Sequence, residues 1–442
     1  MSLSGAAMAD TRPFVVSLYL GLARLAVPFY WLLHFIRCRL GKEDPARANE
    51  KWGRPKIQRP EGHLVWIHAA SVGETNSVLP LIEAMAARGS QVVLTTVTRT
   101  SAELAANRLP DGAIHQFVPF DSPGFISRFL DHWKPDLALT VESEIWPALF
   151  VEIRRRAIPF ALVNGRMSDK SFRGWLRLRA AATYVFGCLD LALAQTPADM
   201  RRLKKLGCKD AVCPGNLKFD ARLDDARTPE LNDLKEALGD RPVWLAALTH
   251  PGEDEIALAA HTELRKTYPD CLLLLVPRHP ARADSIEALV DAEGFSAVRR
   301  SSGDTPEKGT AVFIGDTLGE MALFYQLAPV SFLGGSFNDV GGHNPVEAAT
   351  FGAAIICGPK VANARAVYKI LWGAKAAQRL ETPDELASCV DTLLRDTSAR
   401  AAQAQKALEI VEGGRGALER TVEYLQPLLR RRPGNDTGKA NP

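Results

Sequence analysis

Short apolar runs alternate with helical stretches along most of this chain of 442 residues. The alternation is typical of parallel sheets, because parallel strands need long crossover connections that are usually helices. At 46% hydrophobic and 24% charged residues, the chain is long enough for two globular domains with complete cores. The predicted strands are residues 64–67, 91–98, 137–141, 160–163 and 191–194, then 243–247, 272–276, 312–314, 330–333 and 354–356.

Polar residues follow each of these runs. In open α/β sheets ligands bind at the carboxyl ends of the strands, so each half of the chain should have one functional edge. In the N-terminal half this edge carries the carboxylates Glu74, Glu142 and Glu144. In the C-terminal half it carries Arg278, Lys360 and a glycine-rich turn at 334–347.

The glycine-rich turn at 334–347 predicts a helix that begins close to a ligand. Asn344 would be its N-cap, Pro345 its first residue and Glu347 its third. Such a helix start attracts phosphate, and repeated glycine allows the backbone to approach it. Ser71 and Glu74 form a similar pattern, a capping box, in the N-terminal half. The alternative is that both patterns only satisfy backbone amides.

The N-terminal region is almost wholly apolar from residue 14 to 36, with Arg24 near its middle. This is about the ~20 residues that cross a bilayer, so we expect a membrane anchor over residues 1–45. The segment either spans the bilayer or lies in its interface, and the remaining alternative is a helix buried in the protein. Basic residues on its C-terminal side favour a body on the cytoplasmic face of the inner membrane.

Charge and cysteine content exclude several classes. The net charge of +3 and the absence of helix-turn-helix or zinc-finger spacing argue against nucleic acid as a partner. Basic residues are clustered locally, either as solvated helix faces or as a surface for anionic lipid. The seven scattered cysteines indicate reduced thiols, neither a disulfide framework nor a metal site.

Familiar catalytic motifs are absent. The sequence has no Gly-x-Gly-x-x-Gly or P-loop after a strand, no His-Glu-x-x-His and no Gly-x-Ser-x-Gly. Carboxylates on one edge could act as a base, and cations with glycine on the other could hold phosphate. This division suits transfer of a group from an activated phosphate ester to a hydroxyl.

Composition predicts the domain boundaries. We expect an N-terminal Rossmann-like acceptor domain at 46–222, a polar linker at 223–241 and a C-terminal Rossmann-like nucleotide-binding domain at 242–430. Residues 431–442 should form a disordered tail.

Six further motifs follow one another along the chain. They are His68-Ala-Ala-Ser-Val-Gly-Glu74, Glu142-Ser-Glu-Ile-Trp-Pro147, Gly215-Asn-Leu-Lys-Phe-Asp220, Pro277-Arg-His-Pro280, Gly315-Asp-Thr-Leu-Gly-Glu320 and Gly341-Gly-His-Asn-Pro-Val-Glu347. In sequence and in order these motifs resemble those of the Kdo transferases of lipopolysaccharide assembly, and the likeness extends to about residue 425. The resemblance implies a membrane-associated α/β enzyme of GT-B type, with two Rossmann-like domains facing a cleft. It also implies inverting, metal-independent transfer of Kdo from the donor substrate CMP-Kdo to the lipid A precursor (lipid IVA), with no cofactor.

The resemblance also implies residue roles. Glu74 would be the general base, and Glu142 and Lys218 would support the transition state. The residues implied to hold CMP are Pro277, Arg278, Leu318, Gly319, Glu320, Asn344, Pro345, Val346 and Glu347.

Each role has a structural alternative. Glu74 could only cap its helix, Lys218 could lie on a solvated turn, and Arg278 could pair with a core carboxylate. Of Glu142 and Glu144 one should be structural, and Glu142 is the favoured functional residue. His279 and His343 could bind backbone or substrate equally well.

The chain departs from the family pattern at two places, both of which leave acceptor detail open. It has Pro251 where many relatives have the first Glu of Thr-His-Glu-Gly-Glu, and Gly165 where they commonly have Ala in Asn-Ala-Arg. Two rival functions remain. Another GT-B enzyme or a sugar-nucleotide epimerase would use a UDP-sugar, and a non-catalytic nucleotide sensor would tolerate Glu74→Ala.

Overall fold

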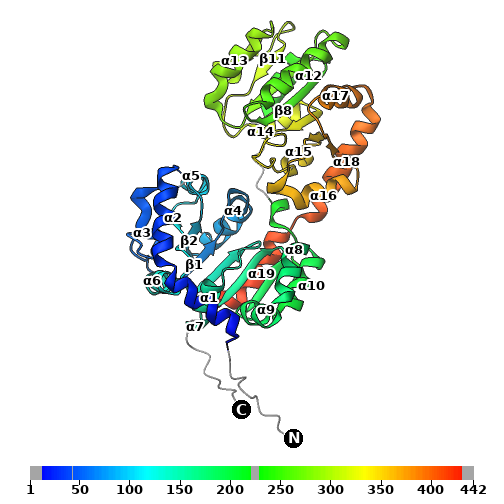
Figure 1. Cartoon of the computed structure of the whole chain (residues 1–442). Coiled ribbons are helices and arrows are strands. Elements are labelled where there is room, and N and C mark those ends of the chain that lie inside the picture. The colour runs from blue at the N-terminus through cyan, green and yellow to red at the C-terminus, as the bar shows by residue number, and fades with distance from the viewer. Residues whose placement is uncertain (1–11, 42, 221–227, 431–442) are drawn as a thin grey trace. The chain divides into compact units, whose positions relative to one another are not determined.

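The computed structural model describes residues 12–41, 43–220 and 228–430 (Figure 1). It divides into two compact units, the first comprising residues 1–220 with 416–442 and the second residues 221–415. The predicted tail at 431–442 lies outside the described residues, as do residues 223–227 of the predicted linker.

The first unit contains a seven-stranded, wholly parallel sheet in the order β3-β2-β1-β4-β5-β6-β7. Its central strands are buried on both faces, which explains their near-continuous apolar runs. The strands are β1 (Leu64–His68), β2 (Gln91–Thr96), β3 (Ile114–Phe117), β4 (Leu137–Val141), β5 (Phe160–Gly165), β6 (Leu191–Ala194) and β7 (Ala211–Val212). The direction of strand order reverses between β1 and β4, the point where such sheets bind ligands.

Helices precede, connect and follow these strands. They are α3 (Ala48–Lys51), α4 (Val72–Ala86), α5 (Arg99–Arg108), α6 (Pro123–Trp133), α7 (Pro147–Arg155), α8 (Asp169–Arg177), α9 (Arg179–Phe186) and α10 (Pro197–Leu206), with 3-10 turns η1 (Pro45–Arg47) and η2 (Leu217–Asp220). Side-chain caps begin several of them; for example, the Thr98 hydroxyl accepts a hydrogen bond from the Ser101 amide at the start of α5. The predicted strand 91–98 therefore ends two residues early, at Thr96.

The second unit also contains a seven-stranded parallel sheet, in the order β10-β11-β9-β8-β12-β13-β14. Its strands are β8 (Val243–Thr249), β9 (Leu272–Pro277), β10 (Ala297–Arg299), β11 (Val312–Ile314), β12 (Val330–Leu333), β13 (Ala354–Cys357) and β14 (Gln378–Arg379). Its helices are α11 (Thr228–Leu238), α12 (Glu253–Thr267), α13 (Ala283–Ala292), α14 (Met321–Leu327), α15 (Val346–Thr350), α16 (Arg365–Gly373), α17 (Glu385–Arg395) and α18 (Thr397–Gly414), with η3 (Pro280–Arg282), η4 (Arg300–Ser302) and η5 (Ala362–Ala364). All ten predicted strands are present.

Two predicted boundaries differ from the structure. Helix α19 (Ala417–Arg430) was predicted to end the C-terminal domain, but it packs in the first unit against α4 and β5. There the Asp220 carboxylate accepts hydrogen bonds from the amides of Gly416 (2.7 Å) and Leu418 (2.6 Å). Most of the described part of the predicted linker is helix α11, which packs on α14 of the second unit.

The predicted N-terminal segment at 14–36 is not one helix but two, α1 (Phe14–Leu25) and α2 (Val27–Arg39). Pro28 lies at the start of α2, where its missing N–H and fixed φ suit a new helix but would break a continuous one. Within the described residues no single helix is long and apolar enough to cross a bilayer. α1 and α2 together have that length and composition, but they meet at a bend of 59°.

Candidate functional site

The site in the first unit is a group of acidic residues at the carboxyl ends of β1 and β4. Glu74 lies in the first turn of α4, directly after β1. Its carboxylate accepts hydrogen bonds from the Ala70 amide (2.7 Å) and the Ser71 hydroxyl (3.2 Å), and that hydroxyl accepts one from the Glu74 amide (3.3 Å). This is the capping box that the sequence indicates, except that the second donor is the amide of Ala70 and not that of the N-cap residue Ser71. Glu74 is therefore a capping residue in the structure. If it also acts as a base, it must do so while it caps the helix.

Glu74 is nevertheless unlike an ordinary capping residue, because it is buried beside other acids. Burial, and then the nearby charges of Glu144 and Glu142, raise its pKa to about 8. Burial also raises the pKa of Glu144, whose Oε2 accepts a hydrogen bond from the Trp146 indole (2.7 Å). A carboxyl group whose pKa lies near the working pH is suited to accept a proton.

Glu142 and Lys218, which the sequence separates widely, form an ion pair of 2.7 Å between Oε1 and Nζ. The two side chains are largely buried, at 9% and 13% exposure. Glu142 follows β4 directly with a left-handed backbone (φ 53°), and Lys218 lies in η2. Non-glycine residues in this conformation are strained, and such residues are common at functional sites. The strain at Glu142 and its ion pair with Lys218 are both in keeping with the predicted grouping of Glu74, Glu142 and Lys218.

Sequence reasoning missed Asn164, which holds the Lys218 turn in place. Asn164 is the residue before the last in β5, also with a left-handed backbone (φ 52°), and its Oδ1 accepts a hydrogen bond from the Leu217 amide (3.1 Å). Asn164 could have been predicted, because it directly follows the predicted strand 160–163 and polar residues after the strands were used to find the site.

His68 was also overlooked as an individual residue, although it belongs to one of the six motifs. Its Nδ1 bonds to the Thr95 carbonyl (3.2 Å), and its ring meets Trp146 edge-on. Burial lowers the His68 pKa to about 4, so the ring is neutral at physiological pH. Its tautomer then carries the proton on Nδ1, which leaves Nε2 as an acceptor.

In the second unit, the glycine-rich turn is organised by Glu253 at the start of α12. The Glu253 carboxylate is 1% exposed and accepts four backbone hydrogen bonds. Their donors are the amides of His250 (3.1 Å), Gly335 (2.6 Å), Ser336 (2.9 Å) and Phe337 (3.0 Å). The amides in the first part of the turn are therefore bonded to Glu253 and are not available to a phosphate.

The helix start after the turn also differs from the prediction. Helix α15 begins at Val346 with Pro345 as N-cap, one residue later than predicted, and has five residues. Asn344 still accepts a hydrogen bond from the Val346 amide, at 3.4 Å. Pro345 and Val346 are buried, whereas Glu347 is partly exposed.

Arg278, which follows β9, lies beside a histidine pair. His250 and His343 stack with their planes 8° apart and their Nε2 atoms 3.1 Å apart. Burial lowers the pKa of both, to about 3 for His343, so the pair is neutral and one ring donates to the other. The Arg278 side chain is partly exposed, and among the described residues its guanidinium has no hydrogen bond or ion pair. Arg278 is therefore a cation available to an anionic ligand.

The predicted donor residues after β11 form a separate cluster. Leu318 is exposed, Gly319 has a φ of +82°, and both Glu320 oxygens pair with Arg300 (2.9 and 3.0 Å). Because β11 and β9 are neighbours in a parallel sheet, this cluster shares an edge with Pro277 and Arg278. Across the described residues, no group of three or more His, Cys, Asp and Glu side chains has the arrangement to hold a metal ion.

A family model and the similar proteins of known name point to the same family. Residues 46–221 match a family model described as 3-deoxy-D-manno-octulosonic-acid transferase (kdotransferase). Enzymes named 3-deoxy-D-manno-octulosonic acid transferase are similar over nearly their whole length. The one from Rickettsia bellii is 35% identical over 94% of this chain and 99% of its own. The one from Bordetella pertussis is 36% identical over 91% and 96%.

Solved structures support the fold. MurG from Acinetobacter baumannii superposes with a TM-score of 0.53 at 13% identity, over 83% of this chain and 100% of its own. A putative UDP-N-acetylglucosamine 2-epimerase from Listeria monocytogenes gives 0.53 at 15% identity, over 84% and 99%. At these identities the likeness concerns the fold alone, and it confirms the predicted α/β architecture of GT-B type with two Rossmann-like domains.

Proposed function

Because this chain belongs to the 3-deoxy-D-manno-octulosonic acid (Kdo) transferase family, we propose that it moves Kdo from CMP-Kdo to the lipid A precursor lipid IVA. The family makes the chain a glycosyltransferase of lipopolysaccharide biosynthesis. The observation that carries the finer proposal is the buried group of Glu74, Glu142 and Lys218 at the edge where the first sheet binds ligands.

In this proposal Glu74 takes the proton from the acceptor hydroxyl while the oxygen of that hydroxyl attacks the anomeric carbon of Kdo. A positioned base of this kind accelerates a reaction by about 10²–10⁴-fold. The carboxylate is anchored on the Ala70 amide and each of its oxygens keeps a lone pair, so capping and proton transfer are compatible. Lys218, fixed by Glu142, stabilises negative charge that develops near the reacting centre.

The second unit would hold the donor. CMP leaves with an added negative charge on its phosphate, and the partly exposed Arg278 guanidinium supports the departure as a cation. The backbone around Asn344 and Glu347, together with Leu318 to Glu320, completes the proposed CMP site. Attack from the face opposite to CMP inverts the anomeric centre, and the proposed step uses these side chains without a metal ion or other cofactor.

The lipid acceptor places the reaction at a membrane. We assign the protein to the cytoplasmic side of the inner membrane, with α1 and α2 as its attachment. The support is their apolar composition and the basic residues that follow them.

Mass analysis of the product tests the proposal. Purified full-length protein is incubated with CMP-Kdo and lipid IVA, with chelator and with UDP-sugars as separate arms. Addition of Kdo mass to the acceptor, release of CMP, and persistence of both in chelator are expected. Turnover of a UDP-sugar instead of CMP-Kdo would contradict the substrate assignment, and loss of activity in chelator would contradict the metal-independent step.

A further inference from the structure

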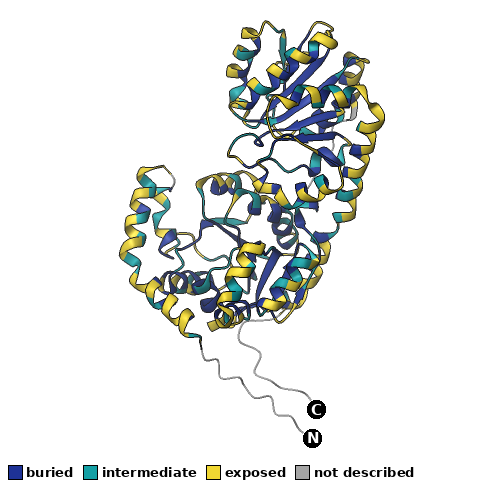
Figure 2. Ribbon diagram, turned by 45° about the vertical axis from the view of Figure 1, so that its right-hand side comes forward, coloured by how far each residue is buried: buried dark blue, intermediate teal, exposed yellow. Residues whose placement is uncertain are grey.

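The positive charge of the chain is concentrated in residues 166–210 of the first unit. This segment has ten lysines and arginines against four aspartates, an excess of six, whereas the whole chain has a net charge of +3. The strands of both sheets are buried, and the helices around them carry the exposed residues (Figure 2). Helix α8 lies in this segment, and none of its residues is buried.

Helix α8 has an aromatic side and a cationic side. Phe172 and Trp175 pack against the core of the first unit. Lys170, Arg173 and Arg177 are exposed, and their spacing of i, i+3 and i+7 places them on one face of the helix. None of the three forms an ion pair with a described residue. Like charges three or four residues apart disfavour a helix, and an anionic ligand on this face would relieve their repulsion.

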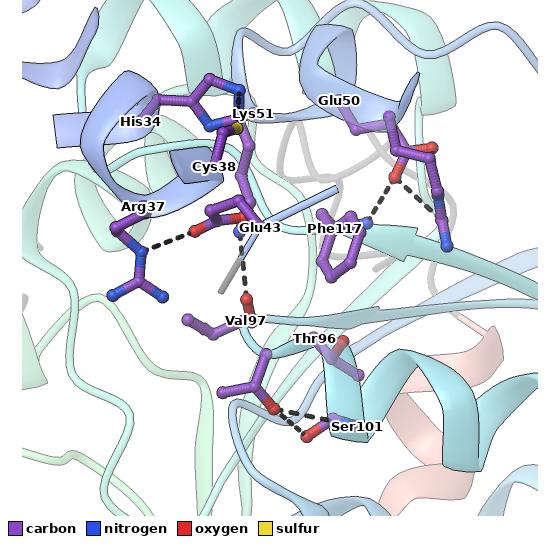
Figure 3. A network of polar contacts seen from close by, with 12 residues as sticks. His34, Arg37, Cys38, Glu43, Glu50, Lys51, Thr96, Val97, Ser101 and Phe117 are labelled. Carbon is purple, nitrogen blue, oxygen red and sulfur yellow. Dashed lines mark hydrogen bonds and ion pairs between the residues drawn. The ribbon is translucent and has the colours of Figure 1, made fainter. Parts of the chain in front are cut away.

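Other cations of the first unit are already paired, as Figure 3 shows for the region near the end of β2. Arg37 Nε donates to Glu43 Oε1 at 2.9 Å, and the other oxygen of Glu43 lies 3.5 Å from Lys51 Nζ. Lys51 also donates to the Val97 carbonyl (3.2 Å). Glu43 and Lys51 are each 3% exposed, so their charges compensate each other inside the protein. The cations of α8 have no such partners among the described residues.

Arg166 links the cationic face of α8 to the acidic site. It directly follows β5, and its amide donates a hydrogen bond to the Glu142 carbonyl at 3.1 Å. Helix α10 holds the next residue, Met167, by both of its backbone groups. The Met167 amide donates to Asp199 Oδ1 (2.8 Å), and its carbonyl accepts from Arg202 Nη1 (2.6 Å). The backbone of Arg166 is therefore fixed beside Glu142.

The Arg166 side chain is partly exposed, and its guanidinium forms no hydrogen bond or ion pair with any described residue. The pairing of β5 with β6 changes register between Leu162 and Gly165, just before it. Such irregularities are common beside active sites, where they redirect a side chain. The acidic residues of the site repel anions, so binding an anion at this edge of the sheet requires a cation such as Arg166.

We propose that Arg166 binds a phosphate group on the sugar of the acceptor, and that the cationic face of α8 attracts this group to the site. A guanidinium fork matches the oxygens of phosphate and can donate two parallel hydrogen bonds to them. The inference rests on the proposed function, since lipid IVA carries phosphate on its sugars. It assigns the recognition of that phosphate to the first unit.

Binding of two forms of the acceptor tests Arg166. Full-length protein in non-ionic detergent is titrated with lipid IVA, and with the same lipid after removal of its phosphates, both without CMP-Kdo. Arg166→Gln should weaken binding of the phosphorylated form about 10–100-fold, as expected for hydrogen bonds to a charged group, and leave binding of the other form unchanged. Arg166→Lys keeps the charge without the fork and should restore part of the loss. A variant Arg166→Gln that keeps the wild-type preference for phosphate would overturn the proposal.

The cationic face of α8 has a matched control. Lys170→Gln with Arg177→Gln should weaken binding of lipid IVA about 2–5-fold at low salt and have no effect at high salt, because exposed charges are screened. Arg88→Gln with Arg108→Gln removes the same charge from exposed positions that lead into β2 and β3, at the opposite edge of the sheet. This control should bind as the wild type does. An equal loss in both pairs would show an effect of net charge alone and would overturn the role of α8.

Steady-state kinetics separates recognition of the acceptor from a structural role. The phosphate does not react, so Arg166→Gln should raise the KM for the acceptor and leave kcat and the KM for CMP-Kdo unchanged. Acceptor binding needs no donor, so it is tested even if Kdo is not transferred. A wild type that transfers Kdo equally well to both forms of the acceptor would contradict this inference alone. Weaker binding of the variants to anionic phospholipid vesicles, with an unchanged preference between the acceptors, would assign the cations to membrane lipid and overturn it.

Discussion

At the scale of single residues, Glu74 joins two tasks that usually belong to different side chains. It closes the start of α4 through the Ala70 amide, and it is buried near Glu142 and Glu144. Burial and these neighbours raise its pKa to about 8, so the carboxylate form that accepts a proton becomes dominant only above that pH. The environment of Glu74 thus controls the pH at which a base can operate.

Replacing Glu144 should lower the pH at which Glu74 becomes able to accept a proton. Glu144→Gln removes a like charge and keeps an oxygen that can accept from the Trp146 indole, so the pKa of Glu74 should fall. We expect the rise of kcat/KM with pH, near pH 8 in the wild type, to occur at lower pH in the variant. The pH–rate profile of Kdo transfer measures it, with the exposed Glu61→Gln as control. A profile that is unchanged or shifted to higher pH would contradict the link between the two residues.

At the scale of elements, the glycine-rich turn shows how one buried carboxylate can shape a loop. Glu253 gathers the amides of Gly335, Ser336 and Phe337, as well as that of His250. Gly335 needs its positive φ of 67° for this, and a Cβ at Gly334 would lie 2.7 Å from the Leu248 carbonyl oxygen. The contacts with Glu253 therefore fix the conformation of the turn and join it to the start of α12, directly after β8.

Glu253→Gln should destabilise the second unit. Glutamine offers one acceptor oxygen and turns an NH₂ group toward amides that need an acceptor, so about two buried N–H groups lose their partner, at ~1–3 kcal/mol each. We expect a lower urea midpoint and weaker CMP-Kdo binding. Glu255→Gln, exposed on the same helix, is the matched control. A variant as stable as wild type would show that the turn does not depend on Glu253.

The buried central strands could be predicted from the sequence. The short edge strands and the packing of the C-terminal helix α19 in the first unit could not. Strands such as β4 and β9 are buried on both faces, so their apolar runs are distinctive. The missed strands β3, β7, β10 and β14 are short or polar, and both residues of β14 are exposed. The site motifs identified Glu74, Glu142 and Lys218, but the Lys218–Glu142 pairing and the occupation of the turn by Glu253 depend on tertiary contacts. The return of α19 depends on Asp220, which lies 196 residues before Gly416.

At the scale of the whole molecule, each unit has its own core and its own buried histidines. Burial lowers the pKa to about 4 for His68 and about 3 for His115 in the first unit. It lowers the pKa to about 3 for both His261 and His343 in the second. The unfolded chain takes up protons on these rings near pH 6.5 while the folded chain does not. Their contribution to stability is thus present above that pH and is lost as the pH falls toward the folded values.

Acid should therefore weaken both units at a higher pH than the one at which ordinary carboxylates, with a pKa near ~4, are protonated. Each such histidine removes up to ~1.4 kcal/mol for each pH unit below 6.5. Urea unfolding at pH 7.5 and pH 5.5, with the two transitions followed separately, measures the loss. His261→Gln should be less stable at pH 7.5 but show a smaller loss in the second transition on acidification. An identical acid loss in the variant would show that His261 does not contribute.

Single-turnover transfer by Glu74→Gln tests the central claim, that Glu74 is the base, most directly. Glutamine is also accepted in a capping box, so the variant keeps an oxygen for the Ala70 amide but cannot take a proton. It also removes a buried acid that costs stability increasingly as the pH rises from its ordinary pKa of 4.5 to its pKa of about 8 in the folded chain. The thermal stability of the variant should therefore be equal or higher. The account predicts intact CMP-Kdo binding with transfer reduced about 10²–10⁴-fold. Transfer within a few-fold of wild type, with an unchanged pH profile, would contradict it.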